Sequence, residues 1–223
     1  MAPSPQLTWQ PSLFAVDDTV GVDREFRRLV RIDLDHESWV DHAPEWVSGS
    51  DRLFEEILIR RGWQQRSRNM YDKKVLEPRL TAPWSLASGE PLEPPILEEI
   101  SVVLCARYGR EFDSVGFNLY RDGRDSVAWH ADRIAKEIDD PTVALVCLGE
   151  PRKFLLRLKG GGQSRSFFLG RGDLLVTGGK TQRTWEHSVP KVADAGPRIS
   201  LAYRHGMDPA AYAGKTVEEP SAG

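Results

Sequence analysis

The chain of 223 residues contains only two cysteines, Cys105 and Cys147, and each lies in an apolar stretch. Such cysteines are typical of buried free thiols in a reducing compartment, and they exclude a disulfide-stabilised secreted scaffold. No apolar run reaches the ~20 residues of a membrane-spanning helix. The N-terminus lacks the basic and apolar regions of a signal peptide, so we expect a cytoplasmic protein with no membrane partner.

The chain also lacks a strong excess of charge of either sign. Its formal net charge is −3, which argues against a protein that coats nucleic acid non-specifically. Basic residues nevertheless gather in two segments, residues 60–79 and residues 150–172. Each segment could form a local phosphate-contacting surface or be an ordinary solvated face, and the sequence leaves both interpretations open.

The hydrophobic pattern predicts one domain over residues 1–223, mainly β with flanking helices (α+β). Before residue 111 it predicts a strand over 26–34, a helix over 53–60, an irregular or hairpin segment over 61–90 and a helix from Pro94-Pro95 to Gly109. Eight short strands follow, at 114–120, 127–132, 142–148, 153–159, 165–169, 173–177, 184–189 and 197–204. Closely spaced strands of this kind favour a sandwich or jelly-roll barrel, here over residues 111–205, with a flexible tail at 206–223.

The most informative motif is His130-Ala131-Asp132, followed far downstream by His187. Two histidines and one carboxylate form the triad that holds non-haem Fe(II) and leaves positions open for a cosubstrate and O₂. On a single β-strand, His130 and Asp132 would project from the same face and could share one metal. A solvent-facing polar pair and a core histidine are the alternative interpretations.

Two arginines follow His187 on the last predicted strand. The guanidinium fork of Arg198 could bind the far carboxylate of a dicarboxylate cosubstrate, and Arg204 shares its face of the strand. The same Arg-x5-Arg spacing occurs twice elsewhere in the chain, where surface charge is the simpler interpretation. The ordered set, and not its parts, predicts an iron- and 2-oxoglutarate-dependent oxygenase.

Five motifs occur in an order that resembles the AlkB family of Fe(II)/2-oxoglutarate dioxygenases, which oxidatively demethylate alkylated bases. They are Asn118-x-Tyr120, His130-x-Asp132, the run GDLLV at 172–176, Trp185-x-His187-x-Val189-Pro190 and the run PRISLAYR at 197–204. The resemblance covers about residues 60–205, and Met70-Tyr71 with residues 77–82 resemble the family's nucleotide-recognition segment.

This resemblance implies a double-stranded β-helix (jelly-roll) barrel with an N-terminal nucleotide-recognition lid at 60–90. It implies that His130, Asp132 and His187 bind Fe(II), and that Arg198 binds the distal carboxylate of 2-oxoglutarate. The other implied cosubstrate contacts are Asn118, Tyr120, Ser200 and Arg204. The implied reaction consumes O₂ and 2-oxoglutarate and removes an N-methyl group as formaldehyde.

Six residues are candidates for contacts with the nucleic acid: Arg66, Arg68, Met70, Tyr71, Trp84 and Arg133. The aromatic residues and Met70 would stack on an extruded base, and Arg66 and Arg68 would contact phosphates. We expect a monomer that acts on single-stranded DNA or RNA, because no large basic surface is available for a duplex.

Two departures from the family pattern concern selectivity. Ser200 stands where the family often has Asn, and Arg133 stands where DNA-repair members tend to have an acidic residue facing the base. Two other functions therefore remain open. One is the same chemistry on a protein, lipid or small molecule, and the other is a barrel-shaped binding module that has lost catalysis. The second is disfavoured, because all three ligand types and Arg198 are present.

Overall fold

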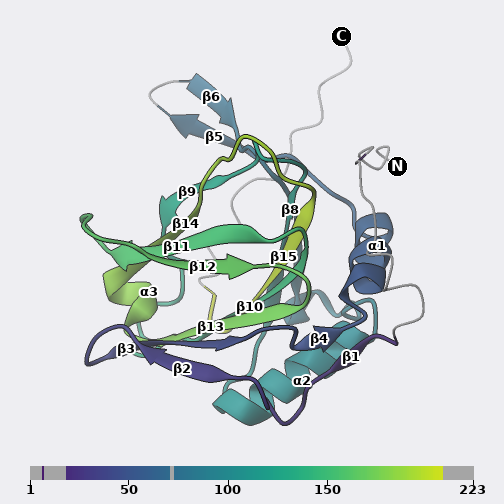
Figure 1. Cartoon of the computed structure of the whole chain (residues 1–223), viewed down its shortest axis with the longest axis horizontal. Helices are drawn as coiled ribbons and strands as arrows, with labels where there is room; N and C mark the ends of the chain where they lie inside the picture. Colours follow the sequence, from purple (N-terminus) through teal and green to yellow (C-terminus); the bar gives the residue numbers. More distant parts are fainter. Residues whose placement is uncertain (1–6, 8–18, 71–72, 208–223) are drawn as a thin grey trace.

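Two antiparallel sheets face each other and form the body of the molecule (Figure 1). The computed structural model describes Leu7 and residues 19–70 and 73–207, with the side chains of residues 68–75 outside that description. The larger sheet has the strand order β2 (Val30–Asp33), β3 (Ser38–Ala43), β13 (Asp173–Gly179), β10 (Val143–Gly149), β15 (Arg198–Arg204), β8 (Ser114–Tyr120) and β7 (Leu80–Ser85). The smaller sheet has the order β12 (Arg165–Leu169), β11 (Arg152–Leu158), β14 (Trp185–Val189) and β9 (Val127–His130).

The remaining described elements are short pairs and helices around these sheets. The pairs are β1 (Gly21–Val22) with β4 (Val47–Ser48), and β5 (Ser67–Met70) with β6 (Lys73–Leu76). The helices are α1 (Ser50–Arg60), η1 (Leu86–Ser88), α2 (Ile96–Tyr108) and α3 (Thr181–Thr184). None of the helices in the described part of the chain is long and apolar enough to cross a membrane.

The larger sheet separates two hydrophobic cores because its central strands are buried on both faces. On β8, Val115, Phe117 and Leu119 point into the core that the sheet shares with helices α1 and α2. Tyr120, on the opposite face of β8, lies in the core between the two sheets. This alternation follows from the two-residue period of a strand, and it places every other residue of β8 and β15 in the space between the sheets.

Most predicted elements are confirmed. The eight strands predicted after residue 114 match β8 to β15 within two residues at each end, and helix α2 begins directly after Pro94-Pro95 and ends at Gly109 in the left-handed conformation. The fold is a jelly-roll barrel of antiparallel sheets, as the resemblance implied. The hairpin of β11 and β12 around Gly160-Gly161-Gly162 has the predicted pairing, with Phe154 opposite Phe167.

Two predictions for the first half of the chain need correction. Only Val30–Asp33 of the predicted strand 26–34 is extended, because Phe26 sits in a turn with a φ of 52°. Residues 61–90 are not all hairpin or irregular, since Leu80–Ser85 forms the edge strand β7. Pro83 argued against a strand, but an edge strand tolerates proline because one side of it needs no ladder hydrogen bonds.

The larger sheet extends beyond the predicted core of 111–205, because β2, β3 and β7 belong to it. Within the predicted lid at 60–90, only the β5–β6 hairpin projects from the sheets (Figure 1). The predicted tail lies outside the described residues, apart from Gly206 and Met207.

The close approach of β3 to β13 generates a stability prediction. A Cβ added at Gly178 would overlap the ring of Trp39, its register partner. Gly178→Ala should therefore destabilise the protein by about 1–3 kcal/mol through overpacking and lower the Tm by roughly 2–10 °C in a thermal melt. The matched control is Gly62→Ala, where nothing lies within 4 Å of the added Cβ. Equal melting temperatures for the two variants would contradict the packing at Gly178.

Candidate metal centre and cosubstrate pocket

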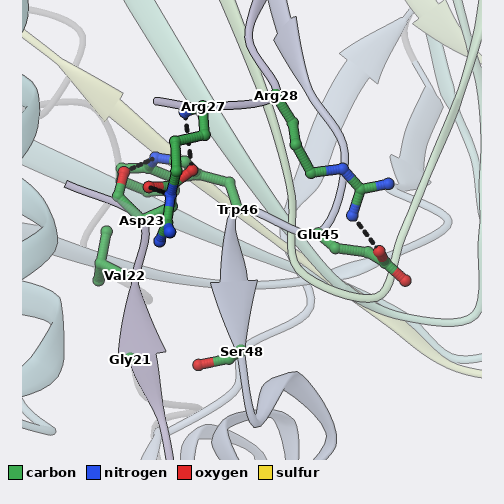
Figure 2. A pocket seen from close by; sticks show the side chains of 8 residues that line it. All are labelled: Gly21, Val22, Asp23, Arg27, Arg28, Glu45, Trp46 and Ser48. Atoms are coloured by element: carbon green, nitrogen blue, oxygen red, sulfur yellow. Dashed lines mark hydrogen bonds and ion pairs between the residues drawn. The ribbon is translucent and has the colours of Figure 1, made fainter. Parts of the chain in front are cut away.

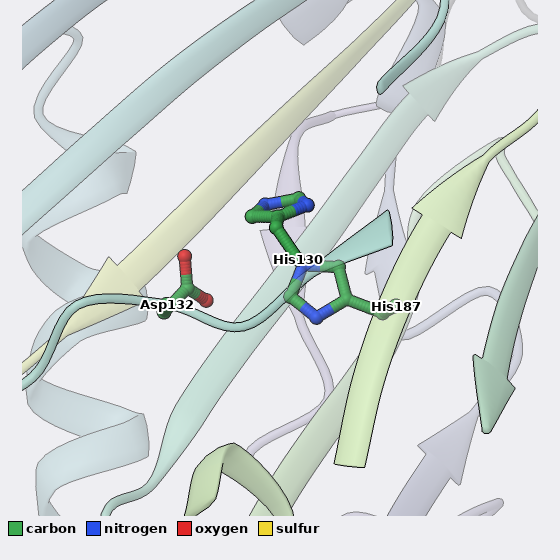
Figure 3. Close-up of side chains that lie close together, drawn as sticks. All are labelled: His130, Asp132 and His187. Carbon is green, nitrogen blue, oxygen red and sulfur yellow. The ribbon is translucent and has the colours of Figure 1, made fainter. Parts of the chain in front are cut away.

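The predicted ligands His130, Asp132 and His187 converge between the sheets (Figure 3). Their ligand atoms all lie within 4.8 Å of one another. His130 is the last residue of β9 and is paired directly with His187 of the neighbouring strand β14. The pairing brings the two imidazole rings to a centroid distance of 4.3 Å, and the ring of His187 stacks on Phe154.

The strand argument that predicted this cluster is correct for the histidines and wrong for the carboxylate. β9 ends at His130, so Asp132 does not occupy the next position on the same face of a strand. It lies in the following loop, where its backbone N–H donates to the side-chain oxygen of Gln182 at 2.9 Å. A side chain placed by a loop cannot be located from a two-residue period.

The electrostatics of the cluster suit a divalent cation. Burial lowers the pKa of His187 to about 3, with a further contribution from His130, and burial also lowers the pKa of His130. Burial alone would raise the pKa of Asp132, but the positive charge of Arg204, followed by the two histidines, holds it below its usual range. Neutral imidazoles with an ionised carboxylate are the protonation states in which these groups bind metals.

A hydrogen bond also sets the tautomer of one histidine. His130 Nδ1 lies 2.9 Å from the carbonyl oxygen of Ala128, and a carbonyl can only accept, so Nδ1 carries the proton. The lone pair of Nε2 is then available to a metal, as in metal sites where the second ring nitrogen is held by a backbone carbonyl. These residues fit Fe(II) by donor type, protonation state and mutual distance.

Arg198, the first residue of β15, points into the same space between the sheets and is only 1% exposed. Its Nε donates to the carbonyl of Leu169 at 3.3 Å, and its Nη2 lies 2.9 Å from Cys147 Sγ. Its Nη1 has no hydrogen-bond partner within the described part of the chain. A buried guanidinium with an unused N–H and no carboxylate on it fits the carboxylate of a bound acid.

The other predicted cosubstrate contacts share this face. The register of β8 and β15 places Tyr120 opposite Arg198 and Asn118 opposite Ser200, and the Arg198 guanidinium lies 5.1 Å from the Tyr120 ring centroid. Ser200 is buried between Arg198 and Arg204 on the same strand face. All four predicted residues therefore line one strip of the sheet with Arg198.

Arg204 reaches the metal centre itself. Its Nη2 donates to Asp132 Oδ1 at 2.8 Å, and both side chains are largely buried. Its guanidinium crosses β8 at Gly116, where an added Cβ would overlap Nη1. Because glycine has no side chain, Gly116 leaves the space that the Arg204 guanidinium occupies when it contacts Asp132.

Three residues that contact this site were not singled out from the sequence. Arg79 donates from Nε to Asn118 Oδ1 at 3.1 Å, and Gln182 and Cys147 make the contacts described above. Arg79 lies within a segment recognised for other reasons, and Cys147 was recognised as buried. No local pattern reveals which neighbour each of them contacts, because all three act across strands distant in sequence.

The predicted substrate residues are not brought together in the same way. Trp84 is paired with Val115, so it lies on the helix-covered face of the larger sheet, and its Nε1 donates to the carbonyl of Glu90. Arg66 and Arg133 are exposed. Tyr71 and the side chains of Arg68 and Met70 lie outside the described residues.

The second basic segment, residues 150–172, is largely engaged within the protein. Arg152 is buried and donates to the carbonyls of Asp122, Asp125 and Pro190. Arg157 pairs with Glu186 at 2.8 Å. Lys159 donates to carbonyls of α3, and Arg165 Nη2 lies 3.5 Å from the carbonyl oxygen of Leu34. The structure thus favours a structural role over a phosphate-contacting surface for these four residues.

A cavity of about 500 Å³ lies away from the metal centre, lined by residues of β1, β4 and the neighbouring turns (Figure 2). Its charged groups are paired with each other: Arg27 binds Asp23 at 3.1 Å, and Arg28 binds Glu45. None of the predicted site residues lines it. Although this cavity is large, its charged groups are already paired and none of the predicted site residues lines it, so it is not the candidate functional site.

The sequence pattern of the 2OG-Fe(II) oxygenase superfamily matches residues 61–204, which include the His–Asp–His cluster, Arg198 and Arg204. This chain belongs to that superfamily. The alpha-ketoglutarate-dependent dioxygenase alkB homolog 3 of Bos taurus is 31% identical over 175 residues, or 70% of this chain and 61% of the bovine protein. The DNA oxidative demethylase ALKBH2 of Arabidopsis thaliana is 35% identical over 135 residues, or 50% of this chain and 43% of that protein.

Within the superfamily, the chain is thus similar in sequence to these AlkB homologues. The chain spans 61% to 62% of the length of the bovine, human and mouse alkB homolog 3 proteins. Among solved structures, a 2OG-Fe(II) oxygenase family oxidoreductase from Burkholderia pseudomallei aligns with 70% of this chain and 79% of its own, at a TM-score of 0.49 and 16% identity.

The metal centre is tested by Asp132→Asn, which keeps the volume and an oxygen acceptor for Arg204 but removes the charge. We expect Mn²⁺ affinity, measured by the EPR signal of free Mn²⁺, to fall more than about 100-fold, because a direct ligand should matter more than the 10–100-fold of an outer partner. The control is Asp139→Asn, whose side chain is 92% exposed. Wild-type affinity in Asp132→Asn would show that Asp132 is not a ligand.

The cosubstrate pocket is tested by Arg198→Ala. Loss of the charge-assisted contact should weaken 2-oxoglutarate binding by roughly ten- to a hundredfold, about 1.5–3 kcal/mol. Arg198→Lys should recover only part of this affinity, since an ammonium does not reproduce the planar fork. Arg124→Ala, with a side chain 88% exposed, is the control. An unchanged Michaelis constant for 2-oxoglutarate in Arg198→Ala would assign the carboxylate to another residue.

Proposed function

We propose that this chain is an Fe(II)- and 2-oxoglutarate-dependent dioxygenase that oxidatively demethylates N-alkylated bases in nucleic acid. The observation that carries the proposal is the convergence of His130, Asp132 and His187, together with a buried arginine between the same two sheets that has an unused N–H group, Arg198. Membership of the 2OG-Fe(II) oxygenase superfamily supports the iron and 2-oxoglutarate part. The Arabidopsis relative, named a DNA oxidative demethylase, supports the nucleic-acid part.

Each residue of the site has a distinct task in this proposal. His130, Asp132 and His187 hold the iron, and Arg198 binds the distal carboxylate of 2-oxoglutarate, with Tyr120, Asn118 and Ser200 on the same strip of sheet. Bound iron would supply the O₂ activation that couples decarboxylation of 2-oxoglutarate to oxidation of the N-methyl group. The hydroxylated methyl group then leaves the base as formaldehyde.

The ion pair between Arg204 and Asp132 contributes in two ways. It keeps the carboxyl ionised despite its burial, and it engages Oδ1, so that Oδ2 remains for the metal. Apolar residues also lie between the two sheets, among them Phe154 stacked on His187, and they limit access of bulk water. A dry, preorganised site protects a reactive oxidation from side reactions.

The part of the chain proposed to hold the nucleic acid is the segment from Arg66 through the β5–β6 hairpin. It carries Arg66, Arg68, Lys73 and Lys74, and its backbone projects beyond the two sheets in Figure 1. Phosphates are the natural partners of such charges, and Met70 and Tyr71 in the same segment could stack on an extruded base. We propose that this hairpin is the lid of a single domain.

Single-stranded substrates fit this chain better than duplexes. Extrusion of a base costs least where the base is unpaired. The basic segment 150–172, the other candidate for contacting a second strand, is largely engaged in internal contacts. We further propose that the protein is a cytoplasmic monomer, as its free thiols Cys105 and Cys147 suggest for the compartment.

A second candidate function is the same oxidation on a protein side chain or a small molecule. The exposed Arg133, next to Asp132, and the net charge of −3 favour it, because a cationic methylated base would be repelled by a neighbouring cation. The two candidates differ in the substrate that stimulates succinate formation.

The substrate is tested with single-stranded oligonucleotides that carry a cationic lesion (1-methyladenine or 3-methylcytosine) or a neutral one (3-methylthymine), beside unmethylated strands. We expect methylated strands to stimulate succinate formation and to lose the methyl group in mass spectrometry. Binding should weaken as salt rises, and Arg66→Ala with Arg68→Ala should reduce the slope of log K against log salt by about 1.4 if both contact phosphates.

The matched control for this pair is Arg124→Ala with Lys153→Ala, which removes two exposed charges elsewhere on the protein. Equal slopes for the two double variants would remove Arg66 and Arg68 from the substrate surface. If no methylated strand binds or stimulates succinate formation at low salt, the nucleic-acid proposal fails, and the protein or small-molecule oxygenase takes its place.

A further inference from the structure

The loop that carries Asp132 is held in place by the short helix α3. The backbone of Asp132 is not part of a sheet ladder, so something else must set the position of its carboxylate. Its N–H donates to Gln182 Oε1 at 2.9 Å, and Gln182 is the second residue of α3. Gln182 is almost fully buried and therefore has a fixed side-chain conformation.

The orientation of the Gln182 amide is determined by its two partners. A backbone N–H can only donate, so the atom facing Asp132 must be the oxygen, and Nε2 then donates to Thr177 Oγ1 at 3.0 Å. Thr177 is buried on β13, and its hydroxyl lies 3.4 Å from the carbonyl oxygen of Val143 on β10. This chain of hydrogen bonds connects Asp132 to the centre of the larger sheet.

The next residue of α3 holds the rest of the loop. Arg183 donates to the carbonyl oxygens of Ile134 at 3.1 Å, Ala135 at 2.6 Å and Ile138 at 2.7 Å. Ala135 also donates its N–H to the carbonyl of Gly206, just beyond β15. Residues 132–138 are thus attached to α3 at four points, and also to Arg204 at the end of β15 and to Gly206 just beyond it.

Helix α3 runs directly into β14, which carries His187. The same short element therefore precedes one metal ligand in the chain and holds the backbone of another. We propose that Gln182 is a positioning residue for the metal centre, which sets the distance of Asp132 from His187. The inference goes beyond the proposed substrate, because it concerns the metal geometry alone and rests only on the three ligands.

A purely structural role predicts a different result. If Gln182 only fills space and stabilises the fold, a substitution of similar volume should change the Tm and leave metal affinity unaltered. If it positions Asp132, metal affinity should fall by the roughly 10–100-fold that is typical when the partner of a metal ligand is removed. The exchange rate of the Asp132 amide hydrogen reports the hydrogen bond directly.

The test compares three variants of the full chain without iron. Gln182→Met keeps the volume and removes both hydrogen bonds, Gln182→Glu keeps the acceptor for Asp132, and Thr184→Ala changes an exposed residue of the same helix. Mn²⁺ affinity is measured by EPR, and amide exchange by NMR. We expect Gln182→Met to bind Mn²⁺ roughly 10–100-fold more weakly with an unprotected Asp132 amide, and Gln182→Glu and Thr184→Ala to stay protected and close to wild type.

The inference is overturned if Gln182→Met binds Mn²⁺ as Thr184→Ala does. Should Gln182→Met fail to fold, Gln182→Ala decides, because it removes both hydrogen bonds without adding a bulky side chain: Mn²⁺ binding weakened by roughly tenfold or more supports the role, and wild-type affinity overturns it. A wild-type chain that binds no Mn²⁺ would instead refute the three ligands themselves. Failure of the three-ligand site can therefore be distinguished from failure of the Gln182 inference, because it would already be seen in the wild-type chain.

Discussion

Two guanidinium groups of β15 are buried between the sheets, and the arrangement of the site follows from their need for negative partners. Arg204 has Asp132, which this pairing keeps ionised and correctly placed to be a metal ligand. The hydrogen-bond partners of Arg198 in the described part of the chain are only a carbonyl oxygen and a thiol. Because an uncompensated buried cation is costly, an anion would be a favourable partner for the unused N–H group of Arg198. Arg198 and Arg204 are the first and last residues of β15, and they share the face of the strand that points between the sheets.

The loops around the metal centre are held by arginine side chains that bind backbone carbonyls. Arg152 joins the turn before β9 to the end of β14, and Arg183 holds the loop after Asp132. Each guanidinium satisfies several carbonyl oxygens that no sheet or helix engages. The loops before β9 and after Asp132 thus owe their positions to side chains from other elements, and the apolar core alone would not place them.

Much of the fold was predictable because its strands are short, apolar and separated by glycine or aspartate. The clustering of His130, Asp132 and His187 was predictable from residue chemistry in a fixed order, and the His130–His187 pairing agrees with it. The position of Asp132 was not, because a loop held by Gln182 has no periodicity to read. The same limit explains why Trp84 was expected near the substrate. Its aromatic ring suggested stacking on a base, but its pairing with Val115 places the ring on the face of the sheet that the helices cover. Sheet register and long-range hydrogen bonds are tertiary properties that a local pattern does not contain.

The unpaired guanidinium of Arg198 also has a consequence for how long the protein lasts. A dicarboxylate that binds only the folded chain adds RT ln(1 + [L]/Kd) to the free energy of unfolding, about 2.7 kcal/mol at a hundredfold excess over Kd. Degradation in cells often follows the small unfolded population, which this term reduces. The folded chain would then resist unfolding more strongly when the dicarboxylate is abundant.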